Sequence, residues 1–504
     1  MTGDWGQHVM GWLLFRQAPW GVPLGELPNY GYPVGTSIAL TDSLPLLSLS
    51  LKPLSTLLPD DFQFVGVWLA FCFVMQGVFG ARLCALLTSD RLAAALGGML
   101  FVTAPVLSHR VGHDTLCAQF LVLWALGLYL SAPRRGTRSL GVSMVACVVC
   151  AALTHPYLWA MCAPICLALL VRLRQARRLG VPGAAAIAAV LLATSLVIFR
   201  VLGLIGEGIE TGVGGIGSYA SDLLTFVSPM ASSRWIPALP QSEGAYEGFG
   251  YLGIGVIGLF AVAAWCVARR RPSPEAWRPL LPLAICVGVM ALFAFSNQWR
   301  VAGFTVFSFR GISAPVAELL SPLRATGRFI WPLAFLTTAA GVRAATRCFG
   351  ERRGAAAGLL AAALLVQVVE AEWPGVSASV ERSDWYTLDD DALAPMASGR
   401  RHVAQVPVQI ISNGAACDSG GFPQGFHLES AYFAYRHRMT TNSGYFARTR
   451  PAVTEACATF EAQVRLGILR DDTVYLVAPT WLDVVEPFAE CARVSPHAFG
   501  CTTR

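Results

Sequence analysis

The residues near the start of the chain that are best suited to chemistry are two aspartates, Asp4 in "GDWGQH" and Asp42 in "LTDSLP". A carboxylate can take a proton from a hydroxyl group or orient that group for attack. Asp42 stands just before an apolar run that contains a proline, so it also fits the N-cap of a helix. The alternative to a chemical role for Asp4 is that it belongs to a frayed chain terminus. We expect both to be catalytic acids, with the helix cap left open for Asp42.

Two arginines, Arg324 and Arg328, lie in the segment "SPLRATGRFIWP". They are four residues apart and would share one face of a helix. The guanidinium fork matches the oxygens of a phosphate, which favours an anionic head group as the ligand. Snorkelling of the arginines toward membrane phosphates is the alternative. Lys52 and Arg110 are further candidates for binding the same phosphate.

The segment "SHRVGHD" contains His109, His113 and Asp114. If this segment is helical, the two histidines share a face and make a weak metal site together with the acid. The alternative is an ordinary polar junction between helices. His113 is also a candidate for contacting the substrate. The cofactor stays open, with a divalent cation as the candidate.

The loop 206–248 combines carboxylates with aromatic side chains. This mixture suits carbohydrate, because a ring stacks on the apolar face of a sugar while acids bind its hydroxyl groups. We expect Glu243, Tyr246 and Glu247 to contact substrate. The loop also contains Glu207, Glu210, Tyr219, Asp222 and Trp235.

The elements that must position these residues are membrane helices. The chain of 504 residues is 55% hydrophobic and only 13% charged, whereas soluble domains carry about a quarter charged residues. Its net charge of +6 comes almost wholly from arginines in short breaks between apolar runs, which argues against nucleic acid as a partner. We expect about ten spans, near 62–87, 91–107, 115–131, 139–153, 156–171, 180–205, 249–268, 279–295, 329–348 and 354–369.

The arginines also predict which loops face the cytoplasm. Alternate connections, such as "APRRGTRS" and "RLRQARRLG", are arginine-rich and are expected inside. The outer side then contains 1–61, the loops 206–248 and 296–328, and everything after about residue 373. A shorter run at 43–58 favours an interfacial or re-entrant helix. Asp4, Gln7 and His8 open a segment rich in Trp and Phe, which we expect to be an amphipathic helix in the membrane interface.

The C-terminal part, 374–504, alternates strand-like and helix-like segments and predicts an extracytoplasmic α/β domain. It contains four cysteines, Cys417, Cys457, Cys491 and Cys501. An even number outside the cytoplasm favours two disulfides, whose pairing stays open. The expected domains are therefore 1–61, the first outer loop with interfacial helices; 62–373, the transmembrane domain; and 374–504.

The chain resembles the GT-C superfamily of membrane glycosyltransferases, and more narrowly a bacterial group of largely uncharacterised GT-C-like proteins. The segments that carry the resemblance are "GDWGQHVMGWLLFR", "NYGYPVGTSIALTDSLPLL", "SHRVGHDTLCAQFLVLW", "EGAYEGFGYLGIGV" and "SPLRATGRFIWP". Asp4 stands where the superfamily has an acid in its first outer loop, and Asp42 matches a second acid. GT-C proteins have a helix before that first acid, so a first transmembrane helix is expected upstream of residue 1.

The resemblance implies a polytopic α-helical protein of the bacterial inner (plasma) membrane that acts as a glycosyltransferase. The implied donor is a sugar linked to a polyprenyl phosphate, and the implied acceptor is an extracytoplasmic glycan, lipid or protein. Asp4 would act as general base or would orient the acceptor. Two alternatives remain: a transporter or flippase of a lipid-linked glycan, and a catalytically inactive GT-C-like assembly subunit.

Overall fold

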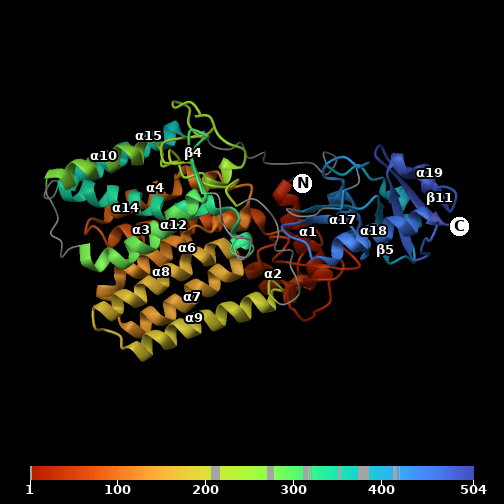
Figure 1. The fold of residues 1–504 in the computed structure, drawn as a ribbon, viewed down its shortest axis with the longest axis horizontal. Helices are drawn as coiled ribbons and strands as arrows, with labels where there is room; N and C mark the ends of the chain where they lie inside the picture. The colour runs from red at the N-terminus through yellow and green to blue at the C-terminus, as the bar shows by residue number, and fades with distance from the viewer. Residues whose placement is uncertain are drawn as a thin grey trace. The chain divides into compact units, whose positions relative to one another are not determined.

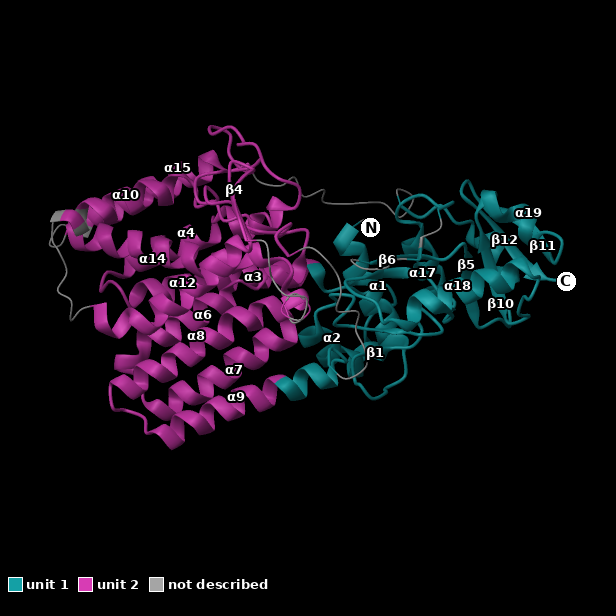
Figure 2. Cartoon of the chain, viewed as in Figure 1, with its two compact units in different colours: residues 1–65, 196–213, 376–504 teal, residues 66–195, 214–375 magenta. Residues whose placement is uncertain are grey.

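The computed structural model describes residues 3–205, 216–269, 277–309, 316, 318, 320–349, 353–372, 385–412, 417–418 and 420–504. The chain divides into two compact units (Figure 2). Unit 1 comprises 1–65, 196–213 and 376–504, and unit 2 comprises 66–195 and 214–375. Each unit is described by itself.

Unit 2 is a bundle of apolar helices (Figure 1). Within it α7 and α8 pack together, α6 packs against both, and α10 packs against α14 and α15. The helices are α3 (Val65–Ala85), α4 (Arg91–Val102), α5 (Pro105–Ser108), α6 (Phe120–Ser131), α7 (Thr137–Thr154), α8 (Pro156–Gln175), α9 (Val181–Val201), α10 (Ile254–Arg269), α12 (Leu281–Phe295), α14 (Trp331–Cys348) and α15 (Arg353–Glu370).

Each of the ten apolar runs expected from the sequence contains a helix in the part of the chain that the structure describes. Three of the ten are weaker candidates for a span. The apolar helices Ile254–Trp265 and Gly354–Glu370 are shorter than a full span, and α14 carries arginines in its last turns. The expectation of a multi-pass membrane protein is confirmed, while the crossing by these last three helices stays a prediction. Among the described residues seven helical segments are long and apolar enough to cross a bilayer: Val65–Ala85, Arg91–Ser108, Asp114–Arg134, Thr137–Thr154, Pro156–Gln175, Val181–Val201 and Arg278–Phe295.

Arginines near the C-terminal ends of α8 and α14 bond to carbonyls at the ends of neighbouring helices. Arg172 donates a hydrogen bond of 2.6 Å to the carbonyl of Tyr129, near the end of α6. Arg343 donates one of 2.8 Å to the carbonyl of Leu87, just after α3. The last carbonyls of a helix have no partner within the helix, and a cation there also suits the helix dipole. These arginines therefore stabilise the ends of neighbouring helices.

Unit 1 contains the expected C-terminal α/β fold. The order of its main sheet is β11-β12-β10-β5-β8; β5 runs parallel to β8 and β10, whereas β12 runs antiparallel to its two neighbours. The strands are β5 (His402–Val406), β8 (Thr440–Thr441), β10 (Thr473–Val477), β11 (Ala489–Ser495) and β12 (Ala498–Thr503). The helices are α16 (Asp390–Ala397), α17 (Phe426–Arg436), α18 (Ala452–Arg465) and α19 (Leu482–Val485). A second sheet joins β7 (Cys417–Asp418), β6 (Gln409–Ser412) and β9 (Gly444–Phe446).

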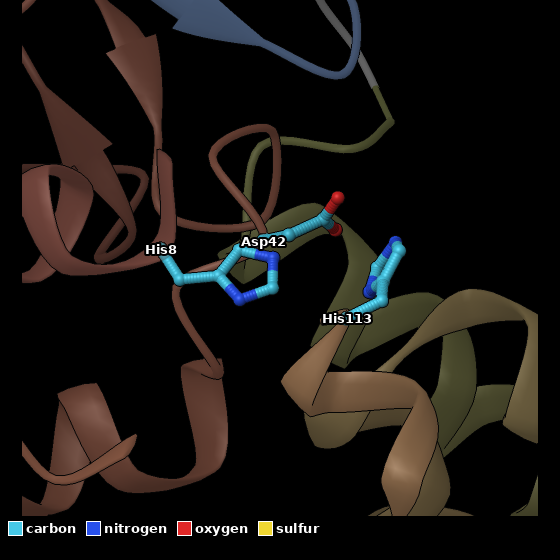
Figure 3. A group of neighbouring side chains, drawn as sticks. All are labelled: His8, Asp42 and His113. Atoms are coloured by element: carbon cyan, nitrogen blue, oxygen red, sulfur yellow. The ribbon is translucent and has the colours of Figure 1, made fainter. Parts of the chain in front are cut away.

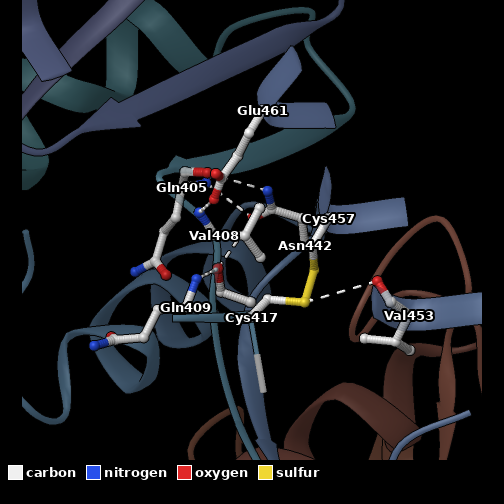
Figure 4. The surroundings of a disulfide bond; sticks show 9 residues. Gln405, Val408, Gln409, Cys417, Asn442, Val453, Cys457 and Glu461 are labelled. Atoms are coloured by element: carbon white, nitrogen blue, oxygen red, sulfur yellow. Dashed lines mark hydrogen bonds between the residues drawn. A yellow bond between two sulfur atoms is a disulfide. The ribbon is translucent and has the colours of Figure 1, made fainter. Parts of the chain in front are cut away.

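The four cysteines of this domain form two disulfides. Cys417–Cys457 joins β7 to α18 (Figure 4), and Cys491–Cys501 joins the antiparallel strands β11 and β12. Beside the first disulfide, the side chain of Asn442 accepts a hydrogen bond from the backbone nitrogen of Gln405 and donates one to its carbonyl (Figure 4). This amide fastens the end of β8 to the end of β5.

The N-terminal segment packs onto this α/β domain within the same unit. The backbone nitrogen of Tyr32 donates to the carbonyl of Thr441 at 2.8 Å, and that of Ala447 donates to the carbonyl of Leu40 at 2.7 Å. The ring of Tyr30 meets that of Phe446 edge-on, with centroids 4.9 Å apart. The sequence separated 1–61 from the C-terminal domain, whereas the structure packs them as one unit.

The expectation of an amphipathic, interfacial first helix is wrong in its environment. Helix α1 (Gly3–Gln17) forms where expected, but every residue from Gly6 to Phe15 is buried. It packs against α17 so closely that a side chain at Gly6 would collide with Leu428. The buried stretch includes the polar Gln7 and His8 beside apolar residues, so the apolar side chains are not gathered on one face that could meet lipid.

The reading of Asp42 as a helix cap is also wrong. The run at 43–58 forms α2 (Pro45–Leu51) followed by the 3₁₀ helix η1 (Lys52–Leu57). The N-cap of α2 is Leu44, which has no side-chain acceptor to offer. Asp42 precedes it with a φ of +51°, in the left-handed region, and so does not cap the helix.

The buried carboxylate of Glu370, the last residue of α15, contacts the start of α10 and gives a test of this fold. Glu370 accepts a hydrogen bond from the backbone nitrogen of Ile254 at 2.7 Å and another from the hydroxyl of Tyr251. We predict that Glu370→Ala lowers the free energy of unfolding by about 1–3 kcal/mol, because both buried donors lose their acceptor. Thermal unfolding in detergent measures this, with the exposed Glu372→Ala as control. Equal midpoints for the two variants would contradict the role of Glu370.

Candidate functional site

The most densely connected charged group of unit 2 consists of Arg110, Glu247 and Arg328. Arg110 Nη1 lies 2.8 Å from Glu247 Oε2, and Arg328 Nη2 lies 2.7 Å from Glu247 Oε1. Arg328 Nε also donates to Glu247 Oε2 at 2.9 Å, so this pair is bidentate. One carboxylate is thus shared by two guanidinium groups. We call these three residues the arginine–glutamate network.

The network is buried and carries a net positive charge. Arg110 is 4% exposed, Arg328 6% and Glu247 9%. Although burial alone would raise the pKa of Glu247, the guanidinium groups of Arg328 and Arg110 hold that pKa well below its ordinary value. The carboxylate is therefore ionised, and two positive charges face one negative charge.

Three segments far apart in the chain meet to build the network. Arg110 follows α5, Glu247 lies in the 3₁₀ helix η4 (Ala245–Gly248) and Arg328 lies in the 3₁₀ helix η7 (Thr326–Ile330). The backbones of η4 and η7 touch at glycines: a side chain at Gly327 would come within 2.4 Å of the Cα atom of Gly248. Only glycine permits this approach, which brings Glu247 within reach of Arg328.

Aromatic rings surround the two guanidinium groups. Arg328 lies over the ring of Tyr157, 4.5 Å from its centroid, and Arg110 lies 5.5 Å from the ring of Trp331. The hydroxyl of Tyr157 accepts a hydrogen bond of 2.7 Å from the backbone nitrogen of Ala325. Tyr157 therefore holds both the side chain of Arg328 and the turn before it. The sequence did not single out this tyrosine, which lies in the first turn of α8.

Arg324 occupies a different environment from Arg328. It is half-buried and lies over the ring of Tyr219, 4.9 Å from the centroid. The predicted shared helix face is wrong, because the chain between the two arginines leaves the 3₁₀ helix η6 (Ser321–Leu323) and turns into η7. Arg328 is fixed inside the network, whereas Arg324 keeps part of its surface open to a ligand.

The histidine motif does not form the predicted metal site. Helix α5 ends at Ser108, so His109 and His113 follow it in a turn and share no helix face. His109 stacks against Phe249 with centroids 4.4 Å apart, and burial, followed by the nearby charge of Arg110, lowers its pKa to about 4. His109 is therefore neutral at pH 7. Asp114 instead begins the 3₁₀ helix η2 (Asp114–Cys117), and its carbonyl accepts from Trp68.

His113 lies near a second histidine. Its ring centroid is 5.6 Å from that of His155, and its Nδ1 atom lies 3.2 Å from the hydroxyl of Thr115. His155 itself accepts from the backbone nitrogen of Tyr157 and so caps α8. The two imidazoles thus lie at the start of η2 and of α8.

The expected carbohydrate-binding residues of 206–248 separate into two groups. Glu243 and Tyr246 are exposed, whereas Glu247 belongs to the network. The carbonyl of Tyr246 also accepts from Arg110, and its ring lies 6.4 Å from that of Tyr219. Glu207 and Glu210 lie outside the described residues.

In unit 1 the two candidate acids have different partners. Asp4 accepts a hydrogen bond of 3.2 Å from the hydroxyl of Tyr445, and it lies in the first turn of α1, where a negative charge suits the helix dipole. One carboxylate oxygen of Asp42 lies within 4.8 Å of a ring nitrogen of His8, and Figure 3 labels both side chains. Both atom types can bind a divalent cation together with further ligands. His113, also labelled in Figure 3, belongs to unit 2.

Lys52, expected to bind phosphate, is enclosed by aromatic rings of unit 1. Its ammonium group lies 3.8 Å from the ring centroid of Phe15 and 4.5 Å from that of Trp20. The lysine is only 6% exposed, and burial lowers its pKa to about 8. This cation fastens η1 to the end of α1, so the structure favours a packing role over phosphate binding.

Comparisons with known proteins place most of the chain in one family. A family model described as "Domain of unknown function (DUF6311)" matches residues 1–372, and its companion, "DUF6311 C-terminal domain", matches 392–502. No curated protein matches the sequence. A solved structure of an Archaeoglobus fulgidus oligosaccharyltransferase, tethered to an acceptor peptide that contains the NVT sequon, is similar at 13% identity with a TM-score of 0.42. That match covers 100% of this chain and 70% of the other, and so low a score transfers neither substrate nor residue roles.

The shared carboxylate gives a prediction about stability. We predict that Glu247→Gln lowers the free energy of unfolding by about 3–5 kcal/mol, because two buried guanidinium groups then face no negative charge. Arg110→Met should cost less, because Glu247 and Arg328 remain as a neutral pair. Unfolding midpoints in detergent compare the two variants. A larger loss for Arg110→Met would contradict the charge assignment of the network.

Proposed function

We propose, for a chain that belongs to the DUF6311 family of domains of unknown function, that it is a membrane glycosyltransferase of the GT-C type. The reaction moves a sugar from a polyprenyl phosphate carrier to an acceptor on the outer side of a bacterial inner membrane. The C-terminal α/β domain would lie on that same outer side. The observation that carries the proposal is the arginine–glutamate network with its net positive charge.

The network supports an anionic, lipid-linked donor for an electrostatic reason. Two buried guanidinium groups share one described carboxylate in a place of low dielectric constant, where positive charge attracts an anion more strongly than in water. From the arginine-rich connections we expect this end of the helices to face outward. A phosphate joined to a membrane lipid is an anion that reaches such a position.

Arg324 is the side chain best placed to touch that phosphate. It is half-buried over Tyr219, whereas Arg328 and Arg110 are occupied by Glu247. When the bond between the anomeric carbon and the phosphate oxygen breaks, negative charge grows on the departing polyprenyl phosphate. The positive charge of Arg324, backed by the network, would stabilise that charge as it develops.

Asp42 is our candidate for the acid that receives the acceptor's proton. Its left-handed φ is a conformation that a folded environment must impose, and such strain is concentrated at functional positions. The acceptor hydroxyl would attack the anomeric carbon and give its proton to the Asp42 carboxylate. Asp4, with its partner Tyr445, would orient the acceptor. If a divalent cation takes part, His8 and Asp42 are candidate ligands among the described residues of unit 1.

The exposed residues Glu243 and Tyr246 complete the proposal as sugar contacts. A ring exposed on one face and a nearby carboxylate are the groups that bind a sugar's apolar face and its hydroxyl groups. A flippase and an inactive assembly subunit would show no turnover in the assay that follows, and this result would overturn the proposal.

The catalytic role of Asp42 is tested with the full chain in nanodiscs and a panel of polyprenyl-phosphate hexoses and pentoses. We predict that Asp42→Asn lowers the release of polyprenyl phosphate at least about 100-fold, because the base is lost while asparagine tolerates the same backbone conformation. Asp391→Asn, at an exposed position of α16, is the matched control. Undiminished turnover by Asp42→Asn would remove this residue from the mechanism.

The role of Arg324 gives a second kinetic prediction. Arg324→Gln should raise the KM for the lipid-linked donor about tenfold, which corresponds to the loss of one charge-assisted hydrogen bond. The control is Arg138→Gln, which removes an exposed arginine from the first turn of α7. Initial rates over a range of donor concentrations separate KM from kcat. Identical donor KM values for the two variants would exclude Arg324 from phosphate binding.

A further inference from the structure

A β-hairpin in the outer loop 296–328 has two chemically different faces. It consists of β3 (Gln298–Val301) and β4 (Phe304–Ser308), which pair antiparallel (Figure 1 labels β4). The turn residues Ala302 and Gly303 both have positive φ, of +49° and +81°. Two such residues make the tight turn whose twist suits a hairpin. The sequence analysis assigned no role to this segment.

An irregularity in the pairing sorts the side chains. Trp299 lies opposite Phe307, but the next pair is Arg300 with Thr305, so Val306 is an extra residue. Without this bulge, alternation along β4 would place Phe304 and Phe307 on opposite faces. With it, one face of the hairpin carries Trp299, Val301, Phe304 and Phe307, and the other carries Gln298, Arg300, Thr305 and Ser308.

The backbone of β3 and of the turn is fastened to the rest of unit 2. The backbone nitrogen of Leu223 donates to the carbonyl of Arg300 at 2.9 Å, and that of Gly303 donates to Asp222 Oδ2 at 2.9 Å. Arg300 is 9% exposed and donates to the side chain of Gln298. These contacts leave β4 as the outer strand of the hairpin.

The apolar face is exposed and continues from a membrane helix. Phe304 is 70% exposed and Phe307 47%. Ring contacts run from Phe295, the last residue of α12, to Trp299 at 6.3 Å and from Trp299 to Phe307 at 5.8 Å. Helix α12 itself has an exposed apolar stripe that reaches toward this end: Leu281, Ile285, Val289 and Leu292.

We infer that the apolar face of this hairpin lies in the boundary between head groups and acyl chains of the bilayer. The aromatic side chains, the absence of charge on that face and the direct continuation from α12 suit this partner, because tryptophan and other aromatics gather at membrane interfaces. Among the described residues no strand pairs with the outer edge of β4, and water or head groups suit the backbone groups there. The hairpin therefore rests at the interface and does not enter the hydrocarbon core.

This contact would also steady the segment that carries Glu247. The backbone nitrogen of Ser221 donates to the carbonyl of Ala294 at 2.8 Å, and its hydroxyl donates to the carbonyl of Gly248 at 2.7 Å. The hairpin is joined to the same strip of chain through Asp222 and Leu223. The inference concerns lipid contact alone and holds whether or not the chain transfers sugars.

Adjacent residues of β4 provide a matched pair of probes. Phe304→Cys and Thr305→Cys place a thiol on the apolar and on the polar face, and both positions are exposed. Each full-length variant is labelled with an environment-sensitive NBD fluorophore and placed in nanodiscs of phosphatidylglycerol and phosphatidylethanolamine. A fraction of the lipid carries a nitroxide, either near the head group or near the end of the acyl chain. Unmodified protein treated with the same label measures the background from the natural cysteines.

We expect a blue-shifted emission at position 304 and loss of most of its fluorescence with the nitroxide near the head group. The loss should be smaller with the deep nitroxide and smaller still for the label at 305. Equal, weak quenching at both positions would overturn the inference, as would stronger quenching at 305 than at 304. Thermal unfolding of each labelled variant verifies that the fold is retained.

Discussion

The arrangement of unit 2 depends on one electrostatic constraint: two guanidinium groups taken out of water must share a single carboxylate. A buried charge without a partner costs several kcal/mol, so Glu247 cannot be removed without exposing or displacing Arg110 and Arg328. The bidentate geometry with Arg328 fixes the plane of the carboxylate, and Arg110 then takes the remaining direction. The contacts that hold these three segments together also hold the three charged side chains within bonding distance.

The local backbone shows how that pairing is reached. Gly248 and Gly327 allow η4 and η7 to touch, and the hydroxyls of Ser221 and Thr225 both donate to the carbonyl of Gly248. Tyr157 holds the turn before η7 from the start of α8. Short 3₁₀ segments at the ends of long helices would be weak alone. Here backbone contacts and polar side chains give them a single conformation.

Much of the secondary structure followed from the sequence because it depends on local composition. Apolar runs of the right length became helices, and the cysteine-bearing tail became an α/β domain with two disulfides. The partners of charged groups did not follow, because Arg110 and Glu247 are 137 residues apart and Glu247 and Arg328 are 81 apart. No periodicity reports such a pairing. The packing of Tyr30 on Phe446 was missed for the same reason.

The hairpin in the loop 296–328 shows a different limit of prediction from sequence. Its two faces depend on local residues, but an extra residue breaks the alternation that would predict them. Alternation of polar and apolar residues predicts which face of a strand is buried, yet one extra residue reverses the pattern beyond it. Val306 is that residue, so a reader of the sequence sees Phe304 and Phe307 on opposite faces. The positive φ of Ala302 and Gly303 sets the turn, and the bulge then corrects the register. The hairpin has one apolar and one polar face only because of its bulge, which is a feature of the folded chain. In our inference its apolar face contacts the bilayer next to the segment that holds Glu247.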